Sequence, residues 1–204
     1  MSTPLDKLLQ RSDIWRVGKT DPGVGALPTG FAELDAELPG RGWPCPALTE
    51  IEYAHDGIGE LRLLLPALAK LSEQERWLAW VAPPYIPYAP ALAHAGINLS
   101  RILMVHPRTP QEALWATEQA LRSGTCSAVL AWLKSPDERA LRRLQLATEA
   151  GESWGIFFNK YAALDHSPAA LRLRLEPVLP RGLAIRILKR RGGWPTGPLF
   201  LKNL

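Results

Sequence analysis

The sequence contains no run of about 18 apolar residues, which is the length that a helix needs to cross a bilayer. Its first residues, MSTPLDKLLQRSD, carry charges where a signal peptide needs an apolar centre. We therefore expect a protein with no membrane span and a cytoplasmic location.

Cysteine and histidine are scarce. The two cysteines, Cys45 and Cys126, lie far apart in the sequence, and the four histidines show no spacing typical of metal ligands. We expect two reduced thiols and no metal site. No Ser/His/Asp or Cys/His arrangement can be identified either, so we expect no catalytic residues and no enzyme activity.

Positive charge is concentrated at the C-terminal end. Residues 171–204 hold eight basic residues and one acidic residue, a net charge of +7, whereas residues 1–170 hold 16 basic and 19 acidic residues, a net charge of −3. This asymmetry indicates an anionic partner for the C-terminal end.

A buried strand, a glycine-containing loop and an apolar helix are predicted in the stretch LTEIEYAHDGIGELRLLLPAL. Phosphate-binding loops of the form GxxxxGK[ST] share this layout. With the second motif glycine at Gly59, the first falls on Ala54, the lysine on Glu60 and the hydroxyl residue on Leu61, while Gly57 adds a glycine to the turn. A carboxylate at the lysine position would repel a triphosphate, and leucine offers magnesium no oxygen. We expect no nucleotide cofactor.

Short apolar runs alternate with helical segments along most of the remaining chain. Further strands are predicted at 77–82, 101–106, 127–133 and 155–159, and helices at 61–71, with a kink at Pro66, and at 88–96, 110–123 and 137–151. This order predicts an α/β domain with a mostly parallel sheet buried on both faces.

The C-terminal end has a different pattern. LRLRL at 171–175 and LAIRILK at 183–189 alternate apolar and basic residues, which is typical of strands with one wet face. We expect them to form an antiparallel hairpin at the edge of the sheet.

The order of these segments resembles the RecA recombinase core. TGFAELDAELPGRGWP resembles its opening, QALRSGTCSAVLAWL the segment leading into its second nucleotide motif, and GIFFNK the strand that ends in its nucleotide-sensing pair. The resemblance implies a RecA-like three-layer sandwich over residues 27–204. Residues 1–26 would form an N-terminal segment and linker, and residues 171–204 a basic extension of the core.

The same resemblance implies a pseudo-ATPase. Trp132 stands where the family's second motif has an acid that holds a magnesium-bound water, and Lys160 replaces the polar partner of Asn159. Two bacterial groups share such a degraded core. RWLAWVAPP and AGINLSRILMV resemble the SulA cell-division inhibitors, which bind FtsZ, whereas the RecA-like entry and the extension GLAIRILKRRGGWPTGPLFL resemble ImuA.

We favour the resemblance to ImuA as the basis for predicting the function. It implies a non-catalytic adaptor in SOS-induced, error-prone translesion DNA synthesis and mutagenesis. The expected partners are an ImuB-type inactive Y-family polymerase and an error-prone C-family polymerase of the replicative type, with RecA and DNA as further partners. A SulA-like cell-division inhibitor that binds FtsZ is the alternative.

Two regions are candidate partner-binding or DNA-binding surfaces. In the basic hairpin the candidates are Arg186, Lys189, Arg190, Arg191 and the nearby Trp194, where a solvated hairpin end is the alternative interpretation.

Trp15 is the candidate in the N-terminal segment. This amphipathic segment either docks onto a partner or a neighbouring copy in a homo-oligomer, or packs back onto its own domain. The glycine loop also leaves two readings open, a cation held by Asp56 and Glu60 or a purely structural turn.

Overall fold

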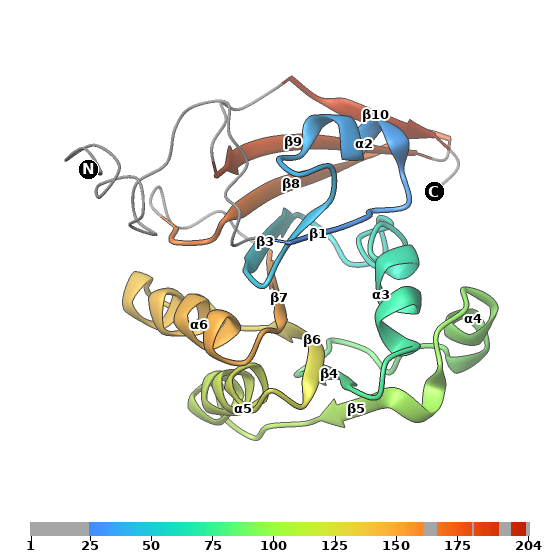
Figure 1. Ribbon diagram of the computed structural model, residues 1–204. Helices are drawn as coiled ribbons and strands as arrows, with labels where there is room; N and C mark the ends of the chain where they lie inside the picture. The colour runs from blue at the N-terminus through green and yellow to red at the C-terminus, as the bar shows by residue number, and fades with distance from the viewer. Residues whose placement is uncertain (1–24, 161–166, 181, 192–196, 203–204) are drawn as a thin grey trace, which may run out of the picture.

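The computed structural model describes residues 25–160, 167–180, 182–191 and 197–202 (Figure 1). The predicted N-terminal segment therefore lies outside the described residues, except for its last two positions. Within the described ranges, no helix is both long enough and apolar enough to cross a bilayer.

Eight strands form one mixed sheet in the order β10-β9-β8-β3-β7-β6-β4-β5. Six neighbouring strands, from β8 to β5 in that order, run parallel, and β9 runs antiparallel to both β8 and β10. Their bounds are β3 (Leu48–Tyr53), β4 (Trp77–Val81), β5 (Ile102–Val105), β6 (Cys126–Trp132), β7 (Trp154–Asn159), β8 (Leu171–Val178), β9 (Gly182–Arg190) and β10 (Leu199–Lys202). A separate antiparallel ribbon pairs β1 (Gly25–Leu27) with β2 (Trp43–Cys45).

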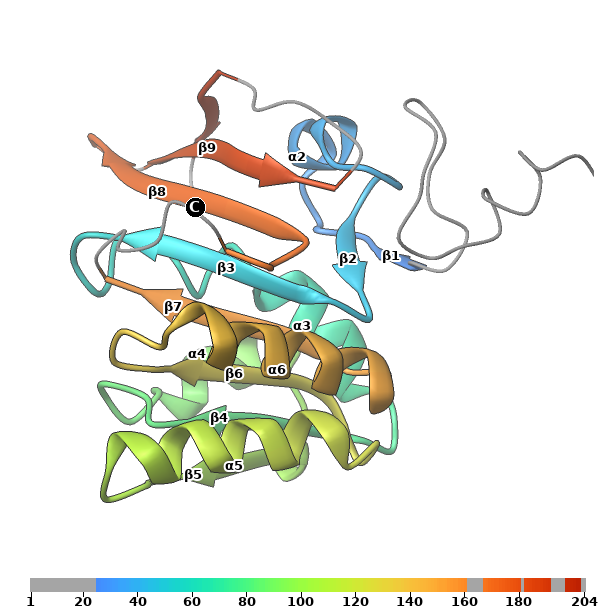
Figure 2. The same ribbon diagram turned by 90° about the vertical axis from the view of Figure 1, so that its left-hand side faces the viewer.

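Helices lie on both faces of the parallel part of the sheet. Figure 2 shows α5 (Pro110–Arg122) and α6 (Glu138–Ala150) on the near face, with α3 (Leu65–Ser72) and α4 (Ala89–His94) behind the sheet. The short helix α2 (Ala32–Glu37) lies beside β9 and β10, and a 3₁₀ turn (Leu99–Arg101) leads into β5.

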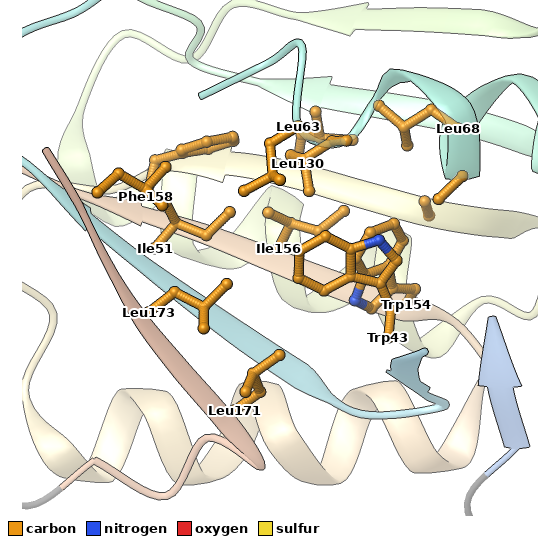
Figure 3. Close-up of a cluster of buried hydrophobic side chains, with 14 of the residues drawn as sticks. Trp43, Ile51, Leu63, Leu68, Leu130, Trp154, Ile156, Phe158, Leu171 and Leu173 are labelled. Atoms are coloured by element: carbon orange, nitrogen blue, oxygen red, sulfur yellow. The ribbon is translucent and has the colours of Figure 1, made fainter. Parts of the chain in front are cut away.

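Two buried apolar clusters, one on each face, hold these layers together. In the larger cluster the rings of Trp43 and Trp154 lie 5.3 Å apart, beside Ile156, with Ile51 farther along the cluster near Phe158 (Figure 3). The Trp154 indole donates a hydrogen bond to Thr49 Oγ1 at 3.0 Å, which satisfies its buried N–H. The burial of aromatic side chains from strands β2, β3 and β7 thus fixes the centre of the sheet.

The second cluster brings α6 very close to the sheet. A Cβ added to Gly155 on β7 would lie 2.7 Å from Thr148 Cγ2 of α6 and 3.0 Å from Leu48 Cδ1 of β3. Only glycine leaves room for this approach. Leu141, Leu144 and Phe157 fill the interface around it.

Local side-chain and backbone features determine where helices α5 and α3 begin. The Thr109 hydroxyl accepts a hydrogen bond from the Glu112 N–H at 3.1 Å, and Pro110 follows as the first helical residue of α5. The predicted kink at Pro66 is wrong. Helix α3 begins at Leu65, so Pro66 occupies the first turn, where its missing N–H removes no helical hydrogen bond.

The predicted RecA-like three-layer sandwich is wrong. The molecule has an eight-stranded mixed sheet with few helices, and its layers are incomplete. Helices α5 and α6 lie over the parallel strands only, and within the described ranges no helix covers the same face of β8, β9 and β10 (Figure 2). The cause is the alternating pattern of β8 and β9, which buries one face and exposes charged residues on the other.

Candidate functional site

The glycine turn after β3 holds its own carboxylate. Glu60 is buried, its Oε1 accepts a hydrogen bond from the Gly57 N–H at 2.9 Å, and its Oε2 accepts one from the Gly59 N–H at 3.1 Å. Gly57 and Gly59 have φ values of +83° and +113°, which side-chain-bearing residues rarely adopt. Backbone N–H groups that could bind an anion therefore already bond to the side chain of Glu60.

The side chains at the other predicted positions of the loop carry no group that could bind phosphate or magnesium. Ala54 is exposed, and Leu61 packs against the larger apolar cluster. The turn is thus a strand-to-helix connection stabilised by internal hydrogen bonds.

Aromatic rings fill the space at the carboxyl ends of β3, β6 and β7. Trp132 stacks on Phe158 with ring centroids 4.4 Å apart and planes 10° apart, and Trp80 lies 5.9 Å from Trp132. Tyr53 meets the edge of Phe158 at 6.0 Å. Trp132, expected to replace an acid, therefore serves as a packing residue.

Asp56 ties this aromatic cluster to the glycine turn. Its Oδ1 accepts a hydrogen bond from the Tyr53 hydroxyl at 2.9 Å, and its Oδ2 lies 2.5 Å from Lys160 Nζ. Burial, and then the hydrogen bond with Asp56, raise the pKa of Tyr53 well above its usual range. Asp56 is thus paired with Lys160, and Glu60 with backbone N–H groups. In the described ranges, no group of three or more His, Cys, Asp or Glu residues could hold a metal ion.

A buried network of charges joins β3 to β8. Arg172 Nε lies 3.1 Å from Glu50 Oε2, Arg172 Nη2 lies 2.6 Å from Glu52 Oε1, and Arg174 Nη2 lies 2.9 Å from Glu52 Oε2. Asn159 on β7 donates a further hydrogen bond to Glu50 Oε1 at 3.2 Å. Glu50 and Glu52 are almost fully buried. Sequence analysis missed this network, although two glutamates inside an apolar strand were a visible signal.

The structure divides the predicted basic residues between the two faces of β9, with Arg186 and Lys189 on one face and Arg190 on the other. Lys189 Nζ donates a hydrogen bond to the Ser167 carbonyl at 2.6 Å, on the same face as Arg172, its partner in the strand register. Arg190 bonds instead to the carbonyl and carboxylate of Glu37 on α2.

The other residues predicted as sites differ in their exposure, and two of them lie outside the described residues. Arg191 is half-buried, Arg186 is exposed, and Trp15 and Trp194 lie outside the described residues.

A group of exposed apolar side chains follows β4 and was not predicted as a site. Tyr85, Ile86 and Tyr88 are 71%, 85% and 73% exposed in the segment PPYIPY. Its prolines restrict the backbone, so the loop would lose little conformational freedom on binding. Grouped apolar side chains at a surface mark contact sites for other proteins. The signal was present in the sequence, as apolar residues placed between prolines in the stretch between the strand predicted at 77–82 and the start of the helix predicted at 88–96.

Comparison with known proteins gives one consistent family. The model of the family "Cell division inhibitor SulA" matches residues 46–155, slightly more than half of the chain. The cell division inhibitor SulA of Pectobacterium atrosepticum is 34% identical over 119 residues, which cover 58% of this chain and 71% of that protein.

Two further relatives have the same description. The protein of Yersinia enterocolitica is 32% identical over 109 residues, covering 53% of this chain and 65% of its own length, and that of Edwardsiella piscicida is 37% identical over 94 residues, covering 46% and 56%. The matches thus span between 56% and 71% of these relatives.

The crystal structure of SulA from Pseudomonas aeruginosa is also similar. It is 31% identical, with a TM-score of 0.47, over 55% of this chain and 96% of the crystallised chain.

These findings correct the main interpretation of the sequence. The ImuA assignment is wrong, and so is the role in DNA repair, translesion synthesis and mutagenesis that it implied, because the family model and the curated relatives are SulA proteins. They give no support to an ImuB-type protein or a polymerase as a partner. The family is described as an inhibitor of cell division and not as an enzyme. The chain belongs to the SulA family of cell division inhibitors.

Proposed function

We propose that this protein inhibits bacterial cell division by binding FtsZ, the partner that the SulA resemblance implied. The observation that carries the proposal is the family match over residues 46–155, a segment that runs from the end of β2 into β7. To reach FtsZ the chain would act in the cytoplasm, the location expected from its sequence. It would act by stoichiometric binding and not by turnover.

The loop of Tyr85, Ile86 and Tyr88 is the surface that we propose for this contact. It lies within the family-matched segment, and its three large apolar side chains are more than two-thirds exposed. Tyrosine and isoleucine would contribute through the burial of apolar surface, at about 25 cal/mol per Å². Aromatic anchors of this kind often dominate the energetics of protein interfaces.

The test is a sedimentation assay of FtsZ polymers formed with GTP. Equimolar protein should reduce the polymer pellet strongly, and the double variant Tyr85→Ala/Tyr88→Ala should require at least about ten-fold more protein for the same effect, equal to about 1.4 kcal/mol. The matched control is Leu179→Ala, because Leu179 is 91% exposed but lies outside the family-matched segment. Unchanged FtsZ polymerisation at a several-fold excess of protein would refute the proposed function.

The same assay tests the proposed contact surface separately from FtsZ binding itself. If the wild-type protein blocks polymerisation and the double variant blocks it equally well, FtsZ binding stands but this loop is not its contact surface.

A further inference from the structure

The outer face of strands β8, β9 and β10 is lined with basic side chains. We refer to Arg174, Glu176, Arg186, Phe200 and Lys202, which share this face in the strand register, as the basic face. Figure 2 shows β8 and β9 beside α6, not beneath it. The basic face belongs to a part of the chain that the family model does not match.

Like charges lie opposite each other across β8 and β9. Arg174 faces Arg186, and Arg172 faces Lys189 at the inner end of the same face. Directly opposed like charges destabilise an antiparallel pair. The arrangement is therefore not explained by the stability of the hairpin alone.

The carboxylates of β3 pair with the two arginines of β8, but with neither Arg186 on β9 nor Lys202 on β10. Glu50 and Glu52 lie beside Arg172 and Arg174, as described above, but Arg186 and Lys202 are exposed and make no ion pair with any described residue. Burial, and then the charge of Arg172, lower the pKa of Lys189, while the charge of Glu50 raises it. Glu176 is the only acidic residue exposed on the basic face as the structure describes it.

An apolar side chain lies next to the unneutralised charges. Phe200 on β10 is 57% exposed and faces Ala184, two residues from Arg186 on β9. A partner that combines carboxylates with an apolar side chain would therefore find both kinds of contact on adjacent strands of the same face. Arginine suits carboxylates because its guanidinium can donate two parallel hydrogen bonds.

We propose that the basic face binds an acidic segment of a protein partner, with carboxylates on Arg186 and Lys202 and an apolar side chain on Phe200. Charge complementarity is the argument for this occupant. A peptide is favoured over nucleic acid because Glu176 interrupts the positive charge of the face. A peptide can place an uncharged residue opposite Glu176, whereas a nucleic acid carries a phosphate at every nucleotide and would be repelled there. The proposal does not depend on FtsZ binding, since it concerns a surface outside the family-matched segment.

The test uses fluorescence anisotropy with two labelled probes, a peptide of glutamates separated by single uncharged residues, one of them leucine, and a single-stranded DNA oligonucleotide. The peptide should bind the full chain, more weakly as salt rises from about 50 to about 200 mM, because both partners are charged. Arg186→Gln/Lys202→Gln should weaken peptide binding at least about five-fold and flatten its salt dependence. Phe200→Ala should weaken it without changing the salt dependence.

The matched control is Arg142→Gln on α6, whose side chain is 68% exposed but lies on a helix outside the basic face. It should leave peptide affinity unchanged. The proposal is overturned if the peptide does not bind, if Arg142→Gln weakens it as much as the double variant, or if DNA binds more tightly and with the same losses. FtsZ inhibition by the double variant should equal that of wild type, which separates this surface from the proposed function.

Discussion

Arg174 on β8 lies directly opposite Arg186 on β9, and Glu52 on β3 pairs with only the first of them. The carboxylate lies 2.9 Å from Arg174 Nη2 and is almost completely buried, whereas Arg186 is exposed. One glutamate thus links β3, the first strand of the family-matched segment, to the C-terminal strand β8. The opposite arginine keeps its charge at the surface.

Replacing Glu52 should cost much of the stability of the domain. In Glu52→Gln, the buried Arg172 and the partly exposed Arg174 lose a shared, almost fully buried carboxylate. Removing one partner of a buried ion pair costs about 3–5 kcal/mol. We expect a loss of about 3 kcal/mol in the free energy of unfolding, measured by urea denaturation followed by tryptophan fluorescence.

Glu138→Gln is the control for this prediction. Glu138 pairs with Arg142 at 2.5 Å on the surface of α6, and both side chains are largely exposed. Exposed pairs four residues apart on a helix contribute about 0.3–0.5 kcal/mol. Similar losses in the two variants would show that the Glu52 network contributes no more than a surface pair.

The stability of the protein should depend on alkaline pH through Tyr53. Its raised pKa means that the folded state favours the neutral phenol, so this contribution is complete below a pH of about 10 and is lost as the pH rises through the higher folded pKa. The midpoint of thermal unfolding should fall between pH 9 and pH 11, and less steeply in Tyr53→Phe. Tyr88→Phe, which alters a mostly exposed tyrosine, should behave as wild type.

Absorbance near 295 nm gives an independent measure of the same group. In the wild-type protein one phenol should ionise above the usual tyrosine range while the fold is intact, and this late step should be missing from Tyr53→Phe. A late step that survives this substitution would assign the raised pKa to another tyrosine.

ATP should not bind at the glycine turn. The N–H groups of Gly57 and Gly59 already donate to the Glu60 carboxylate, whose charge would also repel phosphate. Calorimetry with millimolar ATP and magnesium should show no binding heat, and thermal unfolding should be unchanged by nucleotide. A micromolar dissociation constant would contradict this account of the turn.

Much of the secondary structure could be predicted from the sequence. The helix predicted at 110–123 is α5, because Pro110 at its start, Glu112 in its first turn and Gly124 just past its end mark its two ends in the sequence. The strands predicted at 155–159 and 127–133 correspond closely to β7 and β6. Short apolar runs bounded by turn residues are reliable signals where strands are buried on both faces.

The arrangement of layers could not be predicted in the same way. The order of elements resembled a RecA core, but whether helices cover a given part of the sheet depends on contacts between distant segments. At β8 and β9 the alternating residues indicated that one face of these strands contacts water. A face in contact with water has no helix packed on it, so the alternation argues against a helical layer over the whole sheet. The same alternation also explains why Lys189 and Arg190, adjacent in sequence, point to opposite faces.

The candidate contact surfaces were less predictable than the strands. The stacking of Trp132 on Phe158 depends on the pairing of β6 with β7, which no single segment encodes. Tyr85, Ile86 and Tyr88 lie outside regular elements, where apolar periodicity gives no information. The exposure of such residues is set by which neighbours fail to cover them, and this is a property of the assembled domain.

The position of β3 in the middle of the sheet has a practical consequence for truncated forms. A fragment ending at residue 155, where the family match stops, would lose β8 and most of β7, the two strands that flank β3. The backbone N–H and C=O groups of β3 would then lack their partners along both sides. The carboxylates of Glu50 and Glu52 would lack counter-ions. Such a fragment should aggregate through its open strand edges, so the shared segment of this family member should not be soluble on its own.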